Sequence, residues 1–174
     1  RHLRGSADAY IKLALDRPMV NGMLEVQGVC DASWGSGEGY RSTSGGFIAT
    51  NGFIVMSWAR TQNTISLSSA EAELVSIALC AQEVVWLRNL LDELGYGGSA
   101  VIYSDSTAAI AITAKRGPGR AKHLALRLLW LQDLMRSGRV RFEHVAGEVN
   151  AADVLTKPLK AERFEALRRA LVVV

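Results

Sequence analysis

The dipeptide Asn51-Gly52, set between two strand-like segments, most constrains what this chain can fold into. The flanking segments GFIAT (46–50) and FIVMSWA (53–59) are rich in β-branched and aromatic residues. Asn-Gly accommodates the positive φ angles of a two-residue hairpin turn, so the two segments are predicted to pair as antiparallel strands. Upstream, LEVQGVCD (24–31) alternates its side chains with the strand period of two. The sequence therefore predicts an antiparallel meander of three strands.

The alternation in segment 24–31 separates two faces of the first predicted strand. One face carries Leu24, Val26 and Cys30, and the other carries Glu25, Gln27, Val29 and Asp31. A Gly/Ser-rich segment (33–46) follows, so Asp31 is expected to end the strand. Its carboxylate would then stand at the carboxyl end of a strand, where ligands bind in α/β sheets.

The rest of the chain alternates helical and strand patterns. Ser68 or Ser69 is expected to cap a long helix that ends near Leu94, before Gly95. The later elements are a strand at 100–105, helices at 106–115 and 122–136, a strand at 140–145, and a helical region that begins at Asn150, is interrupted at Pro158 and resumes to about Leu171. Two strands joined by a helical crossover form a parallel pair. We therefore expect an α/β fold with a five-stranded mixed sheet, an antiparallel meander of three plus two parallel strands, flanked by helices.

Length and composition favour one globular domain. The chain has 174 residues, 49% of them hydrophobic, which suffices for a core without disulfides. Residues 1–22 are interpreted as a short helix ending near Pro18 and a linker, the tail of an upstream region, and residues 23–174 as the domain. Cys30 and Cys80 are expected to be buried thiols in a reducing compartment. The apolar runs are broken by charges and fall short of the ~20 residues that cross a bilayer, so no membrane contact is expected.

Basic residues concentrate in one part of the chain. The net charge is only +3, but between positions 115 and 141 Asp133 is the one acid. The basic residues there are Lys115, Arg116, Arg120, Lys122, Arg127, Arg136, Arg139 and Arg141. Such a stripe is either a solvated helix face or a surface that binds phosphates, and the charge pattern alone leaves both interpretations open.

Three carboxylates stand at positions typical of a metal site. Asp31 and Asp105 each end a predicted strand, although an ordinary helix cap or turn would also explain Asp105. At ~100° per residue, Glu73 shares the packed face of the long helix with Ile77, whereas Glu71 lies on the polar face. Glu71 is therefore interpreted as a solvated or capping residue. A carboxylate on the packed face, such as Glu73, is costly unless it is paired or bound to a cation.

Asp153 is the fourth candidate. It lies three residues after Asn150, where a carboxylate stabilises a helix N-terminus, and it would also face the ends of the strands if this helix packs beside the sheet edge. Four converging carboxylates without a cation would repel one another by several kcal/mol. Oxygen ligands without a cysteine or histidine cluster favour Mg²⁺ or Mn²⁺ over zinc. Two such ions can drive hydrolysis of a phosphodiester.

Seven segments together resemble one protein family. They are CDASWGS (30–36), RSTSGGFI (41–48), SWARTQNTISLSSAEAEL (57–74), VVWLRNLLDELG (84–95), IYSDSTAAI (102–110), AKHLALR (121–127) and NAADVLTKPL (150–159). In this order they resemble the ribonuclease H domain of reverse transcriptases of copia-like long-terminal-repeat retrotransposons. The resemblance covers nearly everything from Leu24 to the C-terminus, and the combination of RSTSGG, LSSAEAEL and ADVLTKPL carries its specificity.

The resemblance implies a fold, an activity and a site. It implies a ribonuclease H-like fold and cleavage of the RNA strand of an RNA/DNA hybrid during reverse transcription, leaving 3′-hydroxyl and 5′-phosphate ends. The family's catalytic and metal-binding quartet falls on Asp31, Glu73, Asp105 and Asp153, with two Mg²⁺ ions, or Mn²⁺ as substitute. The helix periodicity selects the same glutamate independently. An upstream polymerase domain is the implied partner beside the hybrid, and cytoplasmic virus-like particles are the implied location.

Candidate contacts with the hybrid are of two kinds. Polar residues for 2′-hydroxyl contacts in the minor groove are Arg41, Ser42, Thr43, Gln62, Ser68 and Ser69. Residues for phosphate contacts are Arg60, Arg120, Lys122 and Arg127. The Lys122-His123 pair is either a hybrid contact or the start of a helix with a capping histidine. The tryptophans are interpreted as core or hairpin residues rather than stacking platforms, and they are Trp34, Trp58, Trp86 and Trp130.

The sequence also departs from the family pattern. AGEVN (146–150) lacks the mobile histidine that cellular ribonucleases H carry between the last strand and the last helix. Glu148 is a hypothetical aid to proton transfer or product release, and His144 is interpreted as core or edge packing within its strand. No acid follows the Lys122-His123 pair, and RGPGRA (116–121) replaces the basic protrusion of bacterial homologues, so the isolated domain is expected to bind hybrid weakly.

A second function stays open beside the nuclease. A catalytically weak domain of the same fold could serve as a nucleic-acid-binding or structural module beside the polymerase, but the complete acidic quartet favours the nuclease. Other metal nucleases of this fold, such as integrases and junction resolvases, lack the RSTSGG and LTKPL segments.

Overall fold

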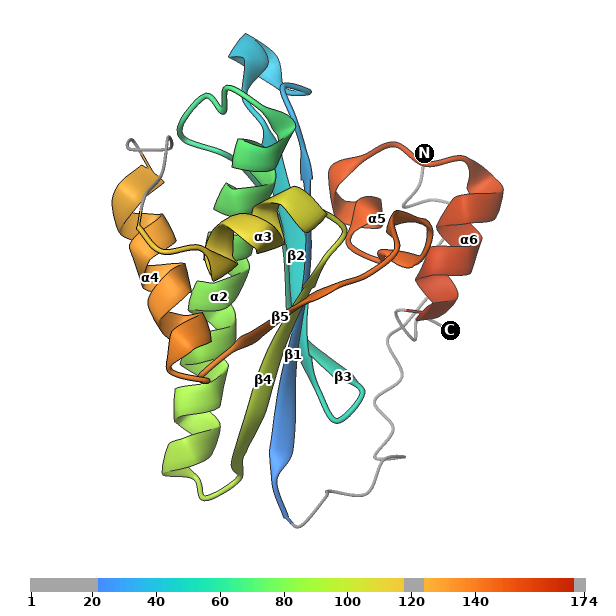
Figure 1. Cartoon of the computed structure of the whole chain (residues 1–174). Helices are drawn as coiled ribbons and strands as arrows, with labels where there is room; N and C mark the ends of the chain where they lie inside the picture. The colour runs from blue at the N-terminus through green and yellow to red at the C-terminus, as the bar shows by residue number, and fades with distance from the viewer. Residues whose placement is uncertain (1–21, 118–123, 171–174) are drawn as a thin grey trace.

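A five-stranded mixed sheet forms the centre of the structure (Figure 1). The computed structural model describes residues 22–117 and 124–170. The strands are β1 (Leu24–Ser33), β2 (Thr43–Thr50), β3 (Phe53–Thr61), β4 (Gly97–Ser104) and β5 (Arg141–His144), in the spatial order β3-β2-β1-β4-β5. The pairs β3-β2 and β2-β1 are antiparallel, and β1-β4 and β4-β5 are parallel. The predicted meander and mixed sheet are confirmed.

Helices cover both faces of this sheet. On one side lie α2 (Ser69–Glu93), α3 (Thr107–Ala114) and α4 (Ala125–Arg136), and on the other lie α5 (Asp153–Thr156) and α6 (Ala161–Ala170) (Figure 1). Two short 3₁₀ turns complete the described elements, η1 (Glu38–Tyr40) and η3 (Gly147–Val149). The helix and linker predicted for residues 1–22 lie outside the described residues, except for Gly22 itself.

Local sequence signals set the turns and the helix ends. Asn51 and Gly52 have φ angles of 50° and 86°, as the predicted hairpin turn requires. Ser68 is the N-cap of α2, because its Oγ accepts a hydrogen bond of 3.2 Å from the backbone N–H of Glu71. Gly95, with a φ angle of 81°, follows the end of this helix. The predicted hairpin and long helix are confirmed.

The strand β1 is longer than the sequence pattern predicts. Asp31 pairs with Gly45 of β2, and the ladder continues through Ala32 to Ser33. Asp31 therefore lies within the strand, and the prediction that it ends the strand is wrong. The reason is that the Gly/Ser-rich segment is not one loop, since its second half begins β2 and keeps the last residues of β1 paired.

The two faces of β1 bury different clusters. Val26 and Cys30 belong to the larger core with α2, α3 and α4, whereas Val29 packs with Phe47 and Ala151 on the α5 side. The predicted division of side chains between the two faces is confirmed. Both cysteines are buried free thiols, as expected, and the hydrogen bond with Cys80, together with burial, raises the pKa of Cys30.

The tryptophans divide between core and surface. Trp58 is buried, and Trp130 is partly buried and packs against the larger core. Trp34 and Trp86 are each 54% exposed. Trp34 lies in the connection of the β1–β2 hairpin, which agrees with the hairpin alternative, whereas the interpretation of Trp86 as a core or hairpin residue is wrong. Trp34 lies beyond the end of β1, where its Nε1 donates a hydrogen bond of 2.8 Å to the carbonyl of Ser66, and Trp86 lies on the face of α2 that the sheet leaves open.

The long helix α2 is apolar enough to meet the length and hydropathy expected of a membrane span. Its mean hydropathy over the most apolar stretch is 1.4, and half of that stretch is buried inside the domain. Glu83 and Arg88 still interrupt the helix, which agrees with the expectation that charges break the apolar runs. Contacts with β1, β2 and β4 explain the composition, because a helix that covers a sheet needs apolar side chains along its packed face.

The contact between β1 and α2 leaves no room at Gly28. A Cβ atom on Gly28 would lie 2.5 Å from Cys80 Sγ and 2.7 Å from Val84 Cγ2. Gly28→Ala is therefore expected to lower the free energy of unfolding by about 1–3 kcal/mol, measured by urea unfolding, because the packed core must shift. The same substitution should cost less in a Cys80→Ala background, and an equal cost in both backgrounds would contradict this explanation.

Candidate metal centre

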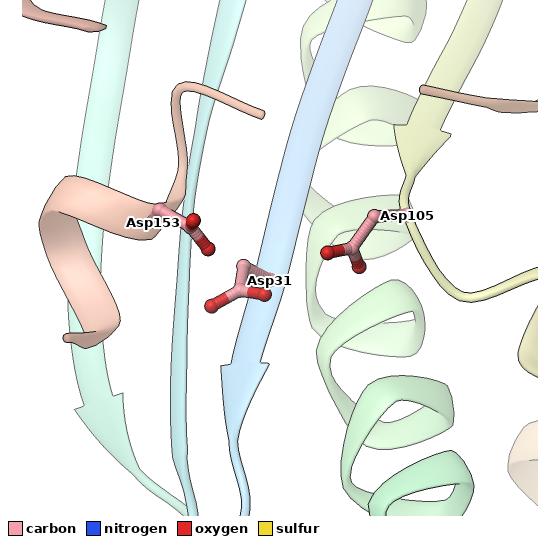
Figure 2. Close-up of side chains that lie close together, drawn as sticks. All are labelled: Asp31, Asp105 and Asp153. Atoms are coloured by element: carbon pink, nitrogen blue, oxygen red, sulfur yellow. The ribbon is translucent and has the colours of Figure 1, made fainter. Parts of the chain in front are cut away.

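Three aspartates from separate elements point toward one another (Figure 2). Asp31 lies on β1, Asp105 directly follows β4, and Asp153 is the first residue of α5. One carboxylate oxygen from each lies within 4.8 Å of the others. β1 and β4 are parallel neighbours, so their carboxyl ends bring Asp31 and Asp105 close together. α5 covers the face of the sheet opposite to α2, and it brings Asp153 to the side of β1 on which the Asp31 side chain lies. The structure thus brings together three of the four predicted carboxylates.

Glu73, the fourth, lies beside this group on α2. Its side chain is buried, and its Oε1 accepts a hydrogen bond of 3.1 Å from the backbone N–H of Ala32, the residue after Asp31. Its Oε2 is buried and has no hydrogen-bond partner among the described residues. Burial, and then the negative charges of Asp31 and Asp105, raise the pKa of Glu73 to about 8. This unpaired oxygen is therefore available to act as a ligand of a metal ion.

Glu71 has the role predicted for it. Its carboxylate accepts a hydrogen bond of 2.7 Å from the backbone N–H of Leu67, just before the N-cap residue of α2. The two glutamates at the start of this helix thus divide between a cap and the carboxylate cluster, as the helical periodicity predicts.

The helix α5 is fastened directly to the middle of the sheet. The side chain of Asn150 is buried, where its Nδ2 donates to the carbonyl of Cys30 at 3.2 Å and its Oδ1 accepts from the backbone N–H of Ala152 at 3.1 Å. Gly45, which pairs with Asp31, lies so close to α5 that a Cβ atom there would be 2.5 Å from Thr156 Cγ2. These two contacts place Asp153 over β1. The sequence marks Asn150 only as the start of a helical region, so its tethering role was missed.

Two cations and a hydroxyl contact the clustered aspartates. Lys157 Nζ lies 3.2 Å from Asp31 Oδ1 and 2.8 Å from Asp153 Oδ1. Arg163 Nη2 pairs with Asp153 Oδ2 and donates to the carbonyl of Gly147, and Thr156 Oγ1 donates to Asp31 Oδ2. Burial works to lower the pKa of Lys157, but the hydrogen bond and charge of Asp153, with the charge of Asp31, leave it raised. The spacing of four residues between Asp153 and Lys157 was the available sequence signal for this pair.

The donor set fits a hard divalent cation. Burial, and then the charge of Asp31, raise the pKa of Asp105, so the ionised cluster is short of positive charge even beside Lys157. The oxygens that face the cluster are carboxylate oxygens, which magnesium and manganese prefer. The unpaired Oε2 of Glu73 adds one more buried oxygen that a cation could bind.

The turn η3 lies against the same site. A Cβ atom on Gly147 would be 3.2 Å from Asp105 Oδ2, so this segment passes close to the cluster. Glu148, in the same turn, is exposed. His144 is also exposed, on the edge strand β5, which agrees with edge packing rather than core packing. The hypothesis that Glu148 assists catalysis stays a prediction.

The predicted minor-groove residues differ in accessibility. Ser42 and Gln62 are buried, where Ser42 Oγ accepts a hydrogen bond from the backbone N–H of Gly35 and Gln62 Nε2 donates to Ser44 Oγ and to the carbonyl of Ala72. These hydrogen bonds engage polar atoms of both side chains inside the protein, and a contact of either with a nucleic acid stays a prediction. Ser68 is engaged as the helix cap. The remaining candidates reach the surface, Arg41 and Ser69 fully and Thr43 in part.

Two of the predicted phosphate-binding arginines share one surface depression. Arg60 of β3 and Arg127 of α4 line a hollow of about 210 Å³ together with Asn63 and Thr64. Arg60 also lies 3.6 Å from a carboxylate oxygen of Glu83. The other predicted residues, Arg120, Lys122 and His123, lie outside the described residues.

The far part of the basic stripe fits the solvated-face interpretation. Arg136 pairs with Asp133, Arg139 donates to Asn89, and Arg141 pairs with Glu25 and Glu143. All three arginines are exposed. Such exposed pairs contribute little to stability.

Comparison with known proteins gives sequence relatives over the whole chain. No protein-family model matches. The retrovirus-related Pol polyprotein from transposon RE2 of Arabidopsis thaliana is 34% identical over 179 aligned positions that include all of this chain, and that from transposon TNT 1-94 of Nicotiana tabacum is 27% identical over 95% of it. The chain spans 12% of the length of each polyprotein.

Solved structures with a similar fold are ribonuclease H domains. The N-terminal RNase H domain of rv2228c from Mycobacterium tuberculosis matches with a TM-score of 0.58 at 16% identity, covering 84% of this chain and 98% of that chain. LC11-RNase H1, isolated from compost, matches with a TM-score of 0.56 at 17% identity, covering 86% and 99%. The same enzyme solved in complex with RNA/DNA hybrid matches with a TM-score of 0.54 at 14% identity, covering 76% and 93%. At these identities, the matches show the fold.

The raised pKa of Glu73 predicts how stability depends on pH in the presence of EDTA. With a pKa of about 8 in the folded state and an ordinary value near 4.5 in the unfolded state, the folded protein holds this proton more tightly. The free energy of unfolding should therefore fall as pH rises from about 5 to about 8, by on the order of 2–4 kcal/mol. Urea unfolding at several pH values measures this.

Substitution of the two glutamates at the start of α2 isolates the effect. Glu73→Gln removes the titrating group from the packed face and should flatten the pH dependence, whereas Glu71→Gln changes the polar face and should leave it as in wild type. Parallel curves for wild type and Glu73→Gln would show that Glu73 does not titrate in this range.

Proposed function

Since this chain belongs to the Pol polyproteins of copia-like retrotransposons and has the ribonuclease H fold, we propose that it hydrolyses the RNA strand of RNA/DNA hybrids during reverse transcription. The convergence of Asp31, Asp105 and Asp153, with Glu73 beside them, is the observation that carries the proposal. Further support comes from LC11-RNase H1, which has the same fold and was solved in complex with RNA/DNA hybrid.

We propose that these four carboxylates hold two divalent ions, Mg²⁺ or Mn²⁺. When bound, such ions activate water and offset the charge on the leaving 3′ oxygen of the RNA. The protein's own contribution is position: Asn150 and Gly45 hold α5 against the sheet, and Ser76 Oγ, which donates to the carbonyl of Asp31 at 2.7 Å, holds α2. The reaction needs no serine or cysteine nucleophile, because water attacks the phosphorus directly.

Recognition of the hybrid is assigned to two parts of the surface. Arg41, Thr43 and Ser69 are accessible polar candidates for contacts with 2′-hydroxyl groups, which distinguish RNA from DNA. Arg60 and Arg127, which share one depression, are the candidates for a phosphate contact. A polymerase domain of the same polyprotein is the proposed neighbour, and cytoplasmic virus-like particles are the proposed location.

Cleavage of labelled duplexes tests the proposed activity. The protein should cleave the RNA strand of an RNA/DNA hybrid in Mg²⁺ or Mn²⁺, and leave RNA/RNA and DNA/DNA duplexes of the same sequence intact. Asp105→Asn should lower the rate by at least about 100-fold, because it removes a charged ligand of the proposed centre. Hybrid binding without cleavage by the wild-type protein would instead support the binding-module interpretation.

The salt dependence of hybrid binding tests the phosphate contacts. Each lost phosphate contact lowers the slope of log K against log salt concentration by about one, so the double variant Arg60→Gln/Arg127→Gln should lower it by about two. Arg136→Gln is the matched control, since Arg136 also lies on α4 and is paired with Asp133. A double variant with the wild-type slope would refute the assignment. Fluorescence anisotropy with a labelled hybrid, in Ca²⁺ or EDTA, measures the slope.

A further inference from the structure

The ammonium group of Lys157 contacts two of the three aspartates that form the proposed metal centre, Asp31 and Asp153. We propose that it is a built-in counter-ion of Asp31 and Asp153, which competes with a divalent cation for these two carboxylates and withdraws when the cation binds. The inference rests on the proposed metal centre. It assigns to Lys157 a role in setting how much free metal the protein needs.

The contacts of Lys157 are those of a counter-ion for two acids at once. Its ammonium group lies 2.8 Å from one oxygen of Asp153 and 3.2 Å from one oxygen of Asp31, so it bridges carboxylates from α5 and β1. Both carboxylates are buried, and the side chains of Asp31 and Asp153 are 0% and 5% exposed. Two buried carboxylates that are both ionised are costly without nearby positive charge. Lys157 supplies such a charge to both of them, and Arg163 supplies one to Asp153.

The same side chain is free to leave. Lys157 is 38% exposed, and it lies just beyond the end of α5, on a flexible stem of four methylene groups whose head can reach water. Its backbone N–H donates to the carbonyl of Asp153 at 3.0 Å, so the stem stays anchored beside the cluster when the ammonium group moves. The backbone of Lys157 is therefore fixed beside the cluster, while its ammonium group can move into the solvent.

Arg163 fits the role of a displaceable counter-ion less well than Lys157 does. Its Nη2 holds the other oxygen of Asp153, but it also donates a hydrogen bond of 2.7 Å to the carbonyl of Gly147. It thus ties α6 to the η3 turn as well as balancing charge. Substitution of Arg163 would disturb this packing, whereas the described hydrogen bonds of the Lys157 side chain go to the two aspartates alone.

Metal binding to the protein without nucleic acid tests the proposal. Titration calorimetry with Mg²⁺ and with Mn²⁺ should show that Lys157→Met binds each ion about tenfold more tightly than wild type, because the competing charge is gone. Lys160→Met removes a charge from the same segment at an exposed position and should stay within about twofold of wild type. Lys157→Arg keeps a positive charge at this position and should therefore bind metal as weakly as wild type.

Thermal unfolding gives a second readout. In EDTA, Lys157→Met should unfold at a lower temperature than wild type, because Asp31 and Asp153 lose the ammonium group that bridges them. Saturating Mg²⁺ should raise the unfolding temperature of the variant by more than it raises that of wild type. If Lys157→Met does not fold in EDTA, Lys157→Gln keeps the length and a hydrogen-bond donor and takes its place in both experiments.

The outcomes separate this inference from the proposed function. Equal or weaker metal affinity in Lys157→Met than in wild type would overturn the role of Lys157 and leave the proposed nuclease intact. Absence of metal binding in both proteins, together with no cleavage of hybrid, would overturn the metal centre and with it this inference.

Discussion

Buried negative charge on the central strand is the constraint to which the rest of this structure answers. Asp31 has no exposed surface, and it lies in the middle strand of the sheet with Asp105 and Asp153 in close reach. The segment that begins with α5 brings compensating groups, the Thr156 hydroxyl and the Lys157 ammonium, whereas α2 adds the carboxylate of Glu73. Charge compensation acts here together with apolar packing, since Ala151 and Leu155 of the same segment pack with Phe47 of β2.

Packing supplies the precision that this charge cluster needs. The β1 strand is covered closely on both faces, by α2 at Gly28 and, through the neighbouring strand, by α5 at Gly45. In both places the absence of a side chain lets a helix approach the sheet backbone directly. The site is thus held between two layers that have little freedom to shift relative to the strand between them.

The sequence predicted those features that depend on neighbouring residues. The hairpin at Asn51-Gly52 follows from φ preferences, and the direction of Glu73 follows from helical periodicity, so both emerged from short segments. The position of Asp31 within β1 could not be predicted from a short segment, because pairing with another strand, β2, decides where β1 ends. The contact of Lys157 with Asp31 was also missed. Unlike its contact with Asp153 four residues earlier, it depends on the placement of α5 over the sheet, which no local pattern specifies.

The order of the elements along the chain has a consequence for biosynthesis. Thr156 reaches back to a carboxylate 125 residues earlier, and Asn150 fastens its helix to a strand formed at the start of the domain. A nascent polypeptide that has left the ribosome only as far as β5 holds all five strands but lacks Asp153. Translation therefore supplies every strand of the sheet before it supplies the last carboxylate of the cluster.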